Sequence, residues 1–145
     1  MNTPAIPAPD YTGTWKFNPR RSALMIPSPD ASLFVIDHRE PLFRLMRTHV
    51  VRGNRDVFAI ELTTDGREVV VERGDLRMRA RAFWHDGWLT FDAQLIRAGE
   101  EGVNTVQYTL APDGQAIVAA ERFRSASINY HNTWWLDRVA DGTLI

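Results

Sequence analysis

The residues with the clearest potential for chemistry are one glutamate and three polar side chains in the C-terminal part of the chain. Glu121 lies in the alternating run 116–123, on the side that carries apolar residues. A carboxylate among apolar neighbours has its pKa raised by desolvation, which suits a general acid or base. Tyr108, Tyr130 and Asn132 have the same inward parity on neighbouring runs and could donate hydrogen bonds to a developing oxyanion. The structural alternative is that Glu121 pairs with an inward arginine or lies near a rim, while the other three satisfy one another.

The histidines lack the spacing of a metal site. His38, His49, His85 and His131 are scattered, without a His-x-His or His-x3-His pair, and the chain has no cysteine. His38 and His49 share parity with apolar neighbours, so either could line an interior. We predict no metal and no cofactor, because the glycine motifs of phosphate and dinucleotide sites are also missing.

The elements that must hold these residues are strands, because apolar residues recur with a period of two after residue 29. The predicted strands are 11–18, 32–39, 42–52, 57–63, 69–72, 76–84, 88–96, 103–110, 116–123 and 128–138. Asp-Gly turns at 65–66, 86–87 and 113–114 favour hairpins. We therefore predict an all-β fold with little helix, an up-and-down antiparallel meander of about ten strands closed into a barrel. An open sandwich is the alternative, and the side of the 32–52 strands that faces the interior stays open.

The remaining segments divide the chain into one domain and two tails. Residues 1–10 are predicted to form a flexible proline-rich tail, residues 11–139 a single barrel domain, and residues 140–145 a C-terminal tail. Residues 19–30 contain three prolines and are predicted to form a loop, with at most a helical turn across Arg20–Met25. This loop could cover one mouth of the barrel, because Leu24, Met25 and Ile26 are apolar.

Composition limits the partners. The chain has 145 residues and a net charge of −1, so it has no basic field that would hold nucleic acid. Arg77, Arg79 and Arg81 form a row that we interpret as a solvated outer face paired with nearby acidic residues. No apolar run reaches the ~20 residues of a membrane helix, and residues 1–10 lack the features of a secretory signal. We predict a cytoplasmic protein with neither nucleic acid nor membrane as a partner.

Short motifs at the two ends of the barrel region carry a resemblance to a known superfamily. Gly13-Thr14-Trp15 and Arg138 are similar to the pair that closes one barrel end in the calycins, which group lipocalins with fatty-acid-binding proteins. The Gly-Thr-Trp-Lys opening, the following Asn-Pro and the turns at 63–66 and 112–114 also resemble small bacterial lipocalin-like proteins. The resemblance implies a lipocalin-like β-barrel with a structural plug made of Gly13, Trp15 and Arg138, in which the guanidinium stacks on the indole.

The chain departs from the fatty-acid-binding proteins in two respects. A proline-broken loop stands where those proteins have a helix pair after the first strand. Their paired carboxylate-binding arginine and tyrosine near the C-terminus are not matched, because Arg138 falls in the plug position. The resemblance therefore does not imply a long-chain fatty acid.

Three functions follow from such a barrel, and the fold alone does not choose among them. The first is binding of a small apolar or aromatic molecule in the interior by inward residues: Phe58, Met78, Trp84, Phe91, Tyr108, Tyr130, Trp134, His38 and His49. The second is a cofactor-free enzyme, namely an isomerase, cyclase, dehydratase or hydrolase, with Glu121 as general acid or base. The third is a homodimeric interaction protein, because Trp88 and Trp135 have ambiguous or outward parity.

Overall fold

The computed structural model describes residues 8–145, and these are all-β, as predicted. The strands are β1 (Gly13–Phe17), β2 (Ala23–Leu24), β3 (Ala31–Arg39), β4 (Leu42–Val51), β5 (Asn54–Thr63), β6 (Val69–Arg73), β7 (Leu76–His85), β8 (Trp88–Arg97), β9 (Glu100–Leu110), β10 (Ala116–Ser125) and β11 (Asn129–Val139). All except the two-residue β2 match predicted strands within a few residues. Of the predicted N-terminal tail, residues 1–7 lie outside the described part. No described residue lies in a helix, so none forms a helix long and apolar enough to cross a membrane.

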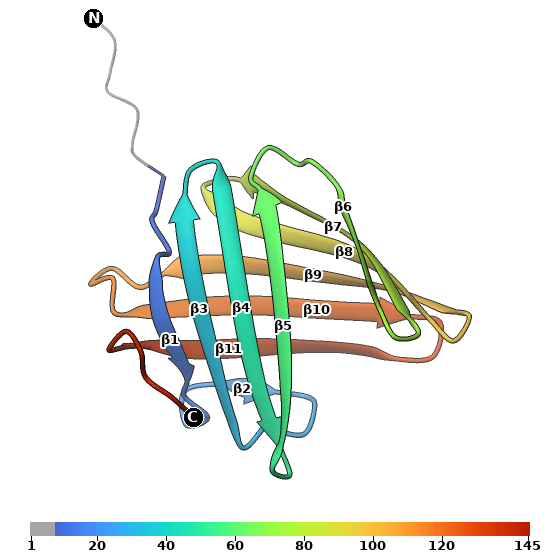
Figure 1. Cartoon of the computed structure of the whole chain (residues 1–145), viewed down its shortest axis with the longest axis horizontal. Helices are drawn as coiled ribbons and strands as arrows, with labels where there is room; N and C mark the ends of the chain where they lie inside the picture. Colours follow the sequence, from blue (N-terminus) through green and yellow to red (C-terminus); the bar gives the residue numbers. More distant parts are fainter. Residues whose placement is uncertain (1–7) are drawn as a thin grey trace, which may run out of the picture.

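Consecutive strands pair as antiparallel hairpins along most of the sheet, in the order β5-β4-β3-β1-β11-β10-β9-β8-β7-β6. β1 pairs with both β3 and β11, which joins the two halves of the sheet. The sheet curls on itself, so that β3–β5 run steeply across β8–β11 (Figure 1). The predicted meander is therefore confirmed as a nearly closed barrel.

The barrel has an opening between β5 and β6, the two end strands of the sheet. At one end of this opening the Gly66 N–H donates to the Ala82 carbonyl at 2.8 Å, and Asp65 forms a β-bridge with Phe83. At the other end Arg73 of β6 forms an ion pair with Asp56 of β5. Backbone hydrogen bonds thus close the opening at one end and charged side chains cross it at the other.

Trp15 fills one end of the barrel, which we call the plugged end. Its side chain is fully buried, Nε1 donates to the Tyr11 carbonyl at 2.9 Å, and the Arg138 guanidinium carbon lies 4.2 Å from its ring centre. Gly13 has a φ of 150°, and a Cβ there would come 2.5 Å from Arg138 Nη1, so glycine is required beneath the guanidinium. The same core cluster contains other fully buried side chains: Phe43, Leu62, Leu89, Ile117 and Leu136.

The segment between β1 and β3 contains no helix, in agreement with the predicted loop, but it does not cover the cavity as a lid. After a turn at residues 19–21, β2 pairs with Asn132 and Thr133 of β11, beyond the point where β1 ends. Leu24 and Ile26 pack against the core, but no residue of 18–30 lines the cavity described below. Prolines within this segment disfavour a regular helix, so the segment instead extends the sheet beside β11.

Residues 140–145 lie against the outer face and contact β1 and β5. Thr14 Oγ1 donates to Asp141 Oδ1 at 3.0 Å, and the Arg55 guanidinium donates to the Ile145 carbonyl. Thr14 is buried although it lies on the outer face, because this C-terminal segment covers it.

Candidate functional site

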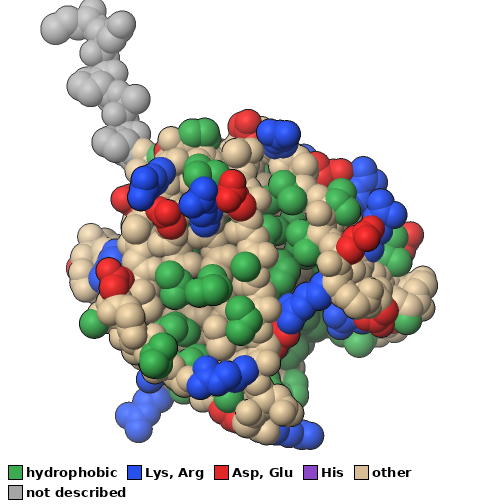
Figure 2. All heavy atoms as spheres, viewed as in Figure 1, with side chains coloured by type: hydrophobic (Ala, Val, Ile, Leu, Met, Phe, Trp, Pro, Cys, Tyr) green, Lys and Arg blue, Asp and Glu red, His purple; other side chains and the backbone are tan. Residues whose placement is uncertain are grey.

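The lumen holds a cavity of about 590 Å³ next to the solid plugged end. Its walls come from β3–β5 on one side and from β6–β11 on the other, and most of the lining side chains are apolar. The cavity extends to the other end of the barrel, where Asp56, Arg73 and Arg97 line it; we call this the open end. Figure 2 shows hydrophobic side chains in a recess beside the β3–β5 surface, with basic side chains at its edge.

The sequence-predicted ligand residues divide into those that line this cavity and those that do not. The lining contains Phe58, Met78, Phe91, Tyr108, Trp134 and His49, together with Glu121. Trp84 and His38 also point inward, but they lie in the plugged end. Tyr130 and Asn132 lie outside the cavity lining as well. The alternation of side chains along each strand therefore predicts which residues point inward. The position of a residue along the barrel axis decides whether an inward side chain lines the cavity.

Glu121 is the centre of a polar cluster in the cavity wall, the Glu121 cluster. Its Oε1 accepts hydrogen bonds from Asn132 Nδ2 at 2.9 Å and from Trp134 Nε1 at 3.0 Å. Its Oε2 accepts from Asn104 Nδ2 at 3.1 Å. The buried Asn132 uses its Oδ1 to accept from the Met25 N–H at 2.8 Å, so its amide is satisfied on both sides. Three N–H donors thus hold the Glu121 carboxylate in place as a fixed acceptor.

The two predicted tyrosines occupy different environments. Tyr108 lines the cavity, and burial raises its pKa far above the ordinary value. Tyr130 stacks on Phe123 with the ring centres 5.1 Å apart, and burial, followed by the negative charge of Glu121, raises its pKa. Both phenols are therefore protonated at neutral pH.

Arg47 is a cavity residue that the sequence reasoning missed. It projects from β4 into the lumen, lies over Phe58 with 5.2 Å from its guanidinium carbon to the ring centre, and approaches Asp56 with 3.6 Å between Nη2 and Oδ2. Burial lowers the pKa of Arg47, while the surrounding negative groups oppose this shift. Arg47 lies on the same face of β4 as Phe43 and Leu45. This pattern would predict an inward Arg47 only if that face of β4 were already known to point inward.

His49 lies beside Arg47 in the cavity wall. Its ring stacks on Trp134 with the centres 5.8 Å apart, and its Nδ1 lies 2.5 Å from Ser32 Oγ. Burial, and then the positive charge of Arg47, lower the pKa of His49 to about 4. The imidazole is therefore neutral at neutral pH. Ser32 is completely buried and does not line the cavity, so the pair is not arranged to present a nucleophile to a ligand.

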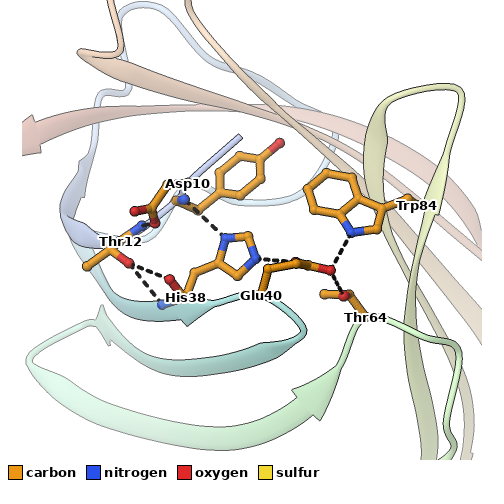
Figure 3. A network of polar contacts seen from close by, with 7 residues as sticks. Asp10, Thr12, His38, Glu40, Thr64 and Trp84 are labelled. Atoms are coloured by element: carbon orange, nitrogen blue, oxygen red, sulfur yellow. Dashed lines mark hydrogen bonds and ion pairs between the residues drawn. The ribbon is translucent and has the colours of Figure 1, made fainter. Parts of the chain in front are cut away.

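A second carboxylate cluster lies at the plugged end, the Glu40 cluster (Figure 3). Glu40 Oε1 accepts from Trp84 Nε1 at 2.9 Å and from the Thr64 hydroxyl, and its Oε2 lies 2.7 Å from His38 Nε2. The Tyr11 N–H donates to His38 Nδ1 at 3.2 Å, so Nε2 carries the proton that points to Glu40. Burial raises the pKa of Glu40, but these hydrogen bonds outweigh it and hold the pKa below its ordinary value. His38 and Trp84 thus serve the packing of this end.

The outer surface accounts for other residues singled out in the sequence. Trp88 is 42% exposed, whereas the ring of Trp135 is covered by the Arg21 guanidinium at 3.7 Å, so the two do not form one exposed aromatic patch. The arginine row of β7 forms ion pairs with acidic neighbours: Arg77 with Glu72, Arg79 with Glu68 and Arg81 with Asp92. Within residues 8–145, no three or more His, Asp or Glu side chains gather in a way that could hold a metal ion.

Comparison with known proteins identifies the fold but no close relative. No protein-family model matches the chain, and no curated protein matches it in sequence. The chain is similar to the crystal structure of zebrafish ileal bile acid-binding protein complexed with cholic acid, with a TM-score of 0.60 and 14% identity over 89% of this chain and 98% of that one. A secretory abundant heat soluble protein from Ramazzottius varieornatus has a TM-score of 0.60 and 11% identity, over 89% and 95% of the two chains.

A further similar structure is the Schistosoma mansoni fatty acid binding protein in complex with arachidonic acid. Its TM-score is 0.52 and its identity 6%, over 90% of this chain and 96% of that one. These likenesses cover nearly the whole barrel in each case. The likeness shows that this chain shares the barrel fold of these structures, the fold that the Trp15 and Arg138 motifs predicted.

Proposed function

We propose that this protein binds a small apolar or aromatic molecule in the cavity of its barrel. The observation that carries the proposal is the contrast within one lumen, where the plugged end is solid and the rest keeps about 590 Å³ of space between apolar and aromatic walls. Small-molecule sites have volumes of roughly 300–1,000 Å³ and a few fixed polar groups among apolar ones. The bound cholic acid and arachidonic acid of two similar barrels support the same kind of use.

The hydrogen bonds of the Glu121 carboxylate favour a binding function over a catalytic one. A general acid or base must exchange a proton with its substrate along a hydrogen bond. The contacts of the Glu121 carboxylate are with three protein N–H groups, from Asn104, Asn132 and Trp134. This arrangement suits a fixed recognition group better than a proton carrier.

The test is a titration with N-phenyl-1-naphthylamine, an uncharged aromatic fluorophore that brightens in apolar surroundings. We expect saturable binding by the wild type and about tenfold weaker binding by Ala119→Phe, because Ala119 is a small residue in the cavity wall and the larger ring would occupy the space. The matched control is Ala120→Phe, one position along the same strand on the exposed side. Far-ultraviolet circular dichroism confirms that both variants are folded.

Two results would contradict the proposal. One is the absence of saturable binding by folded wild-type protein across a panel of uncharged apolar probes. The other is equal affinity of the wild type and folded Ala119→Phe, which would locate the probe outside the lumen.

A further inference from the structure

The outer face of β3–β5, which we call the β3–β5 face, carries exposed apolar side chains at its centre. Cross-strand pairing places Val35, Met46 and Ala59 in one row, because Met46 is opposite both of the others. Val57 lies in the next row, two residues from Ala59 on β5. Val35 is 37% exposed, Met46 47% and Val57 51%, and Ala59 is exposed as well. A contiguous apolar patch on the outside of a folded protein is typical of an interaction surface.

Charged side chains border this apolar patch at both ends of the strands. At one end, pairing places Asp37, Arg44 and Glu61 side by side, and two carboxylates with one guanidinium give this row a net charge of −1. At the other end, Arg55 lies opposite Val50 and gives its row a positive charge. Figure 2 shows hydrophobic side chains over β3–β5 between charged side chains. The β3–β5 face therefore has opposite charges at its two ends.

This charge pattern makes the β3–β5 face complementary to a second copy of itself. In a symmetric dimer the same patch of both subunits meets across a two-fold axis. An axis that lies between the two faces and perpendicular to the strands reverses the order of the rows. With this axis level with Phe58, Arg55 of each copy faces Glu61 of the other. In the same arrangement Val57 of each copy faces Ala59 of the other.

The alternative axis, parallel to the strands, is disfavoured by the same charges. It would set each row against the same row of the other copy, so that Asp37 and Glu61 would meet carboxylates and Arg44 would meet a guanidinium. Like charges in contact across an interface cost free energy. The order of the rows along the strands thus selects the perpendicular axis.

The size of the β3–β5 face limits the strength of such a dimer. Three strands of up to ten residues cover about 14 Å by about 33 Å. This area is small beside the roughly 800 Å² that each partner of a standard interface buries. Leu144 of the C-terminal segment is 89% exposed and lines a groove with Val35 and Met46, so it can add apolar area to the contact. A weak dimer is therefore the expected assembly.

We propose that the β3–β5 face is the interface of a symmetric homodimer, with its apolar centre packed on itself and Arg55 of each copy paired with Glu61 of the other. Glu61 also contacts Arg44 of its own chain, 2.9 Å from its Nε, so the pairing places this carboxylate between two guanidinium groups. The cavity lies on the opposite side of the same strands. The inference therefore does not depend on the proposed ligand binding.

The test is sedimentation velocity of the full chain from about 5 to about 500 µM. We expect a monomer–dimer equilibrium with a dissociation constant of about 10–100 µM. Val57→Asp should weaken the dimer at least about tenfold, because it buries an unpaired carboxylate of each copy in the apolar centre. Val70→Asp is the matched control, because Val70 is 49% exposed on the outer side of β6, away from this face. This control should leave the equilibrium unchanged.

Charge reversal tests the orientation of the two copies. Arg55→Glu and Glu61→Arg each bring like charges together twice in the dimer, so we expect each variant alone to dimerise about tenfold more weakly than the wild type. In an equal mixture of the two variants, every contact between positions 55 and 61 joins opposite charges again. We expect the mixture to form a heterodimer about as tightly as the wild type dimerises. Far-ultraviolet circular dichroism confirms that each variant is folded.

Two kinds of result would overturn the inference. The first is a wild type that stays monomeric at every concentration, or a dimer that folded Val57→Asp leaves intact; either result would exclude this face as the interface between copies. The second is undiminished dimerisation of the single charge variants, or a mixture of them that stays monomeric, because the pairing of Arg55 with Glu61 would then be wrong.

Discussion

The two ends of the lumen contain similar polar clusters with opposite outcomes. Glu40 at the plugged end and Glu121 in the cavity wall each accept three hydrogen bonds, one of them from a tryptophan Nε1. In the Glu40 cluster, His38 is satisfied on both ring nitrogens by Glu40 and the Tyr11 N–H. In the Glu121 cluster, the amide of Asn104 is satisfied on one side only.

This contrast shows that one barrel contains a carboxylate cluster in which every polar atom is satisfied and another in which one is not. A cluster in which every atom has a partner fixes its surroundings and leaves nothing to offer a ligand. In the other kind of cluster, the carboxylate is held by three donors yet one buried acceptor, Asn104 Oδ1, lacks a partner. The Glu40 cluster belongs to the first kind and the Glu121 cluster to the second.

The largest expected effect is the cost of shortening a leucine at the plugged end. Leu89 is fully buried there, whereas Leu95 on the same strand is partly buried at the cavity. We expect Leu89→Ala to lower the free energy of unfolding by about 2–5 kcal/mol, and Leu95→Ala by only about 1 kcal/mol, because one leaves a void in close packing and the other enlarges an existing space. Urea unfolding measures both. Equal costs would contradict the distinction between a solid end and a hollow one.

A smaller effect on the free energy of unfolding should distinguish substitutions of Glu40 and Glu121. Glu40→Gln places an NH₂ group against one of three fixed donors, so we expect it to cost about 1–2 kcal/mol of unfolding free energy. Glu121→Gln should cost less than about 0.5 kcal/mol, since Asn104 can flip its amide without losing a partner. Thermal and urea unfolding of the pair provide the measurement. A costlier Glu121→Gln would mean that the cavity cluster is the more rigid one.

The smallest effect concerns pH. The pKa of His49 is about 4 in the folded protein, below the ordinary 6.5, so the unfolded chain binds the proton more readily between these values. Stability due to His49 is therefore present above pH 6.5 and is lost as pH falls toward 4. The ring is partly exposed, so solvent screening reduces the effect, and we expect a loss of no more than about 1 kcal/mol of unfolding free energy. His49→Gln should flatten this part of the stability profile, measured by urea unfolding at pH 7, 5.5 and 4.5; an unchanged slope would contradict the assignment.

The strands could be predicted from the sequence because their signals are local. Alternation and Asp-Gly turns depend on neighbours a few residues apart, and Gly66 and Gly87 indeed have positive φ in such turns. Depth within the barrel could not be predicted, because it depends on register between strands. Trp84 and Phe91 have the same inward parity, yet Trp84 pairs with Leu89 in the plugged end, whereas Phe91 pairs with Ala82 and lies at the cavity.

Part of the candidate site could not be predicted from the sequence, for a related reason. Tyr108, Trp134 and Glu121 followed from inward parity on their strands. Arg47 did not, because arginine usually faces solvent and the inward face of β4 is fixed only by its pairing with β3 and β5. Asn104 lies on the inward face of β9, but its hydrogen bond to Glu121 on the neighbouring strand β10 could not be predicted from the alternation alone.

The opening between β5 and β6 also has a consequence for aggregation. Each of these strands pairs with a single neighbour, so each exposes an edge that another chain could join. β6 is especially exposed to this hazard because it contains three consecutive valines, Val69, Val70 and Val71. It is only five residues long, and Glu68, Glu72 and Arg73 flank the valines with charge. Short length and flanking charge thus let the barrel keep an opening without offering a template for fibrils.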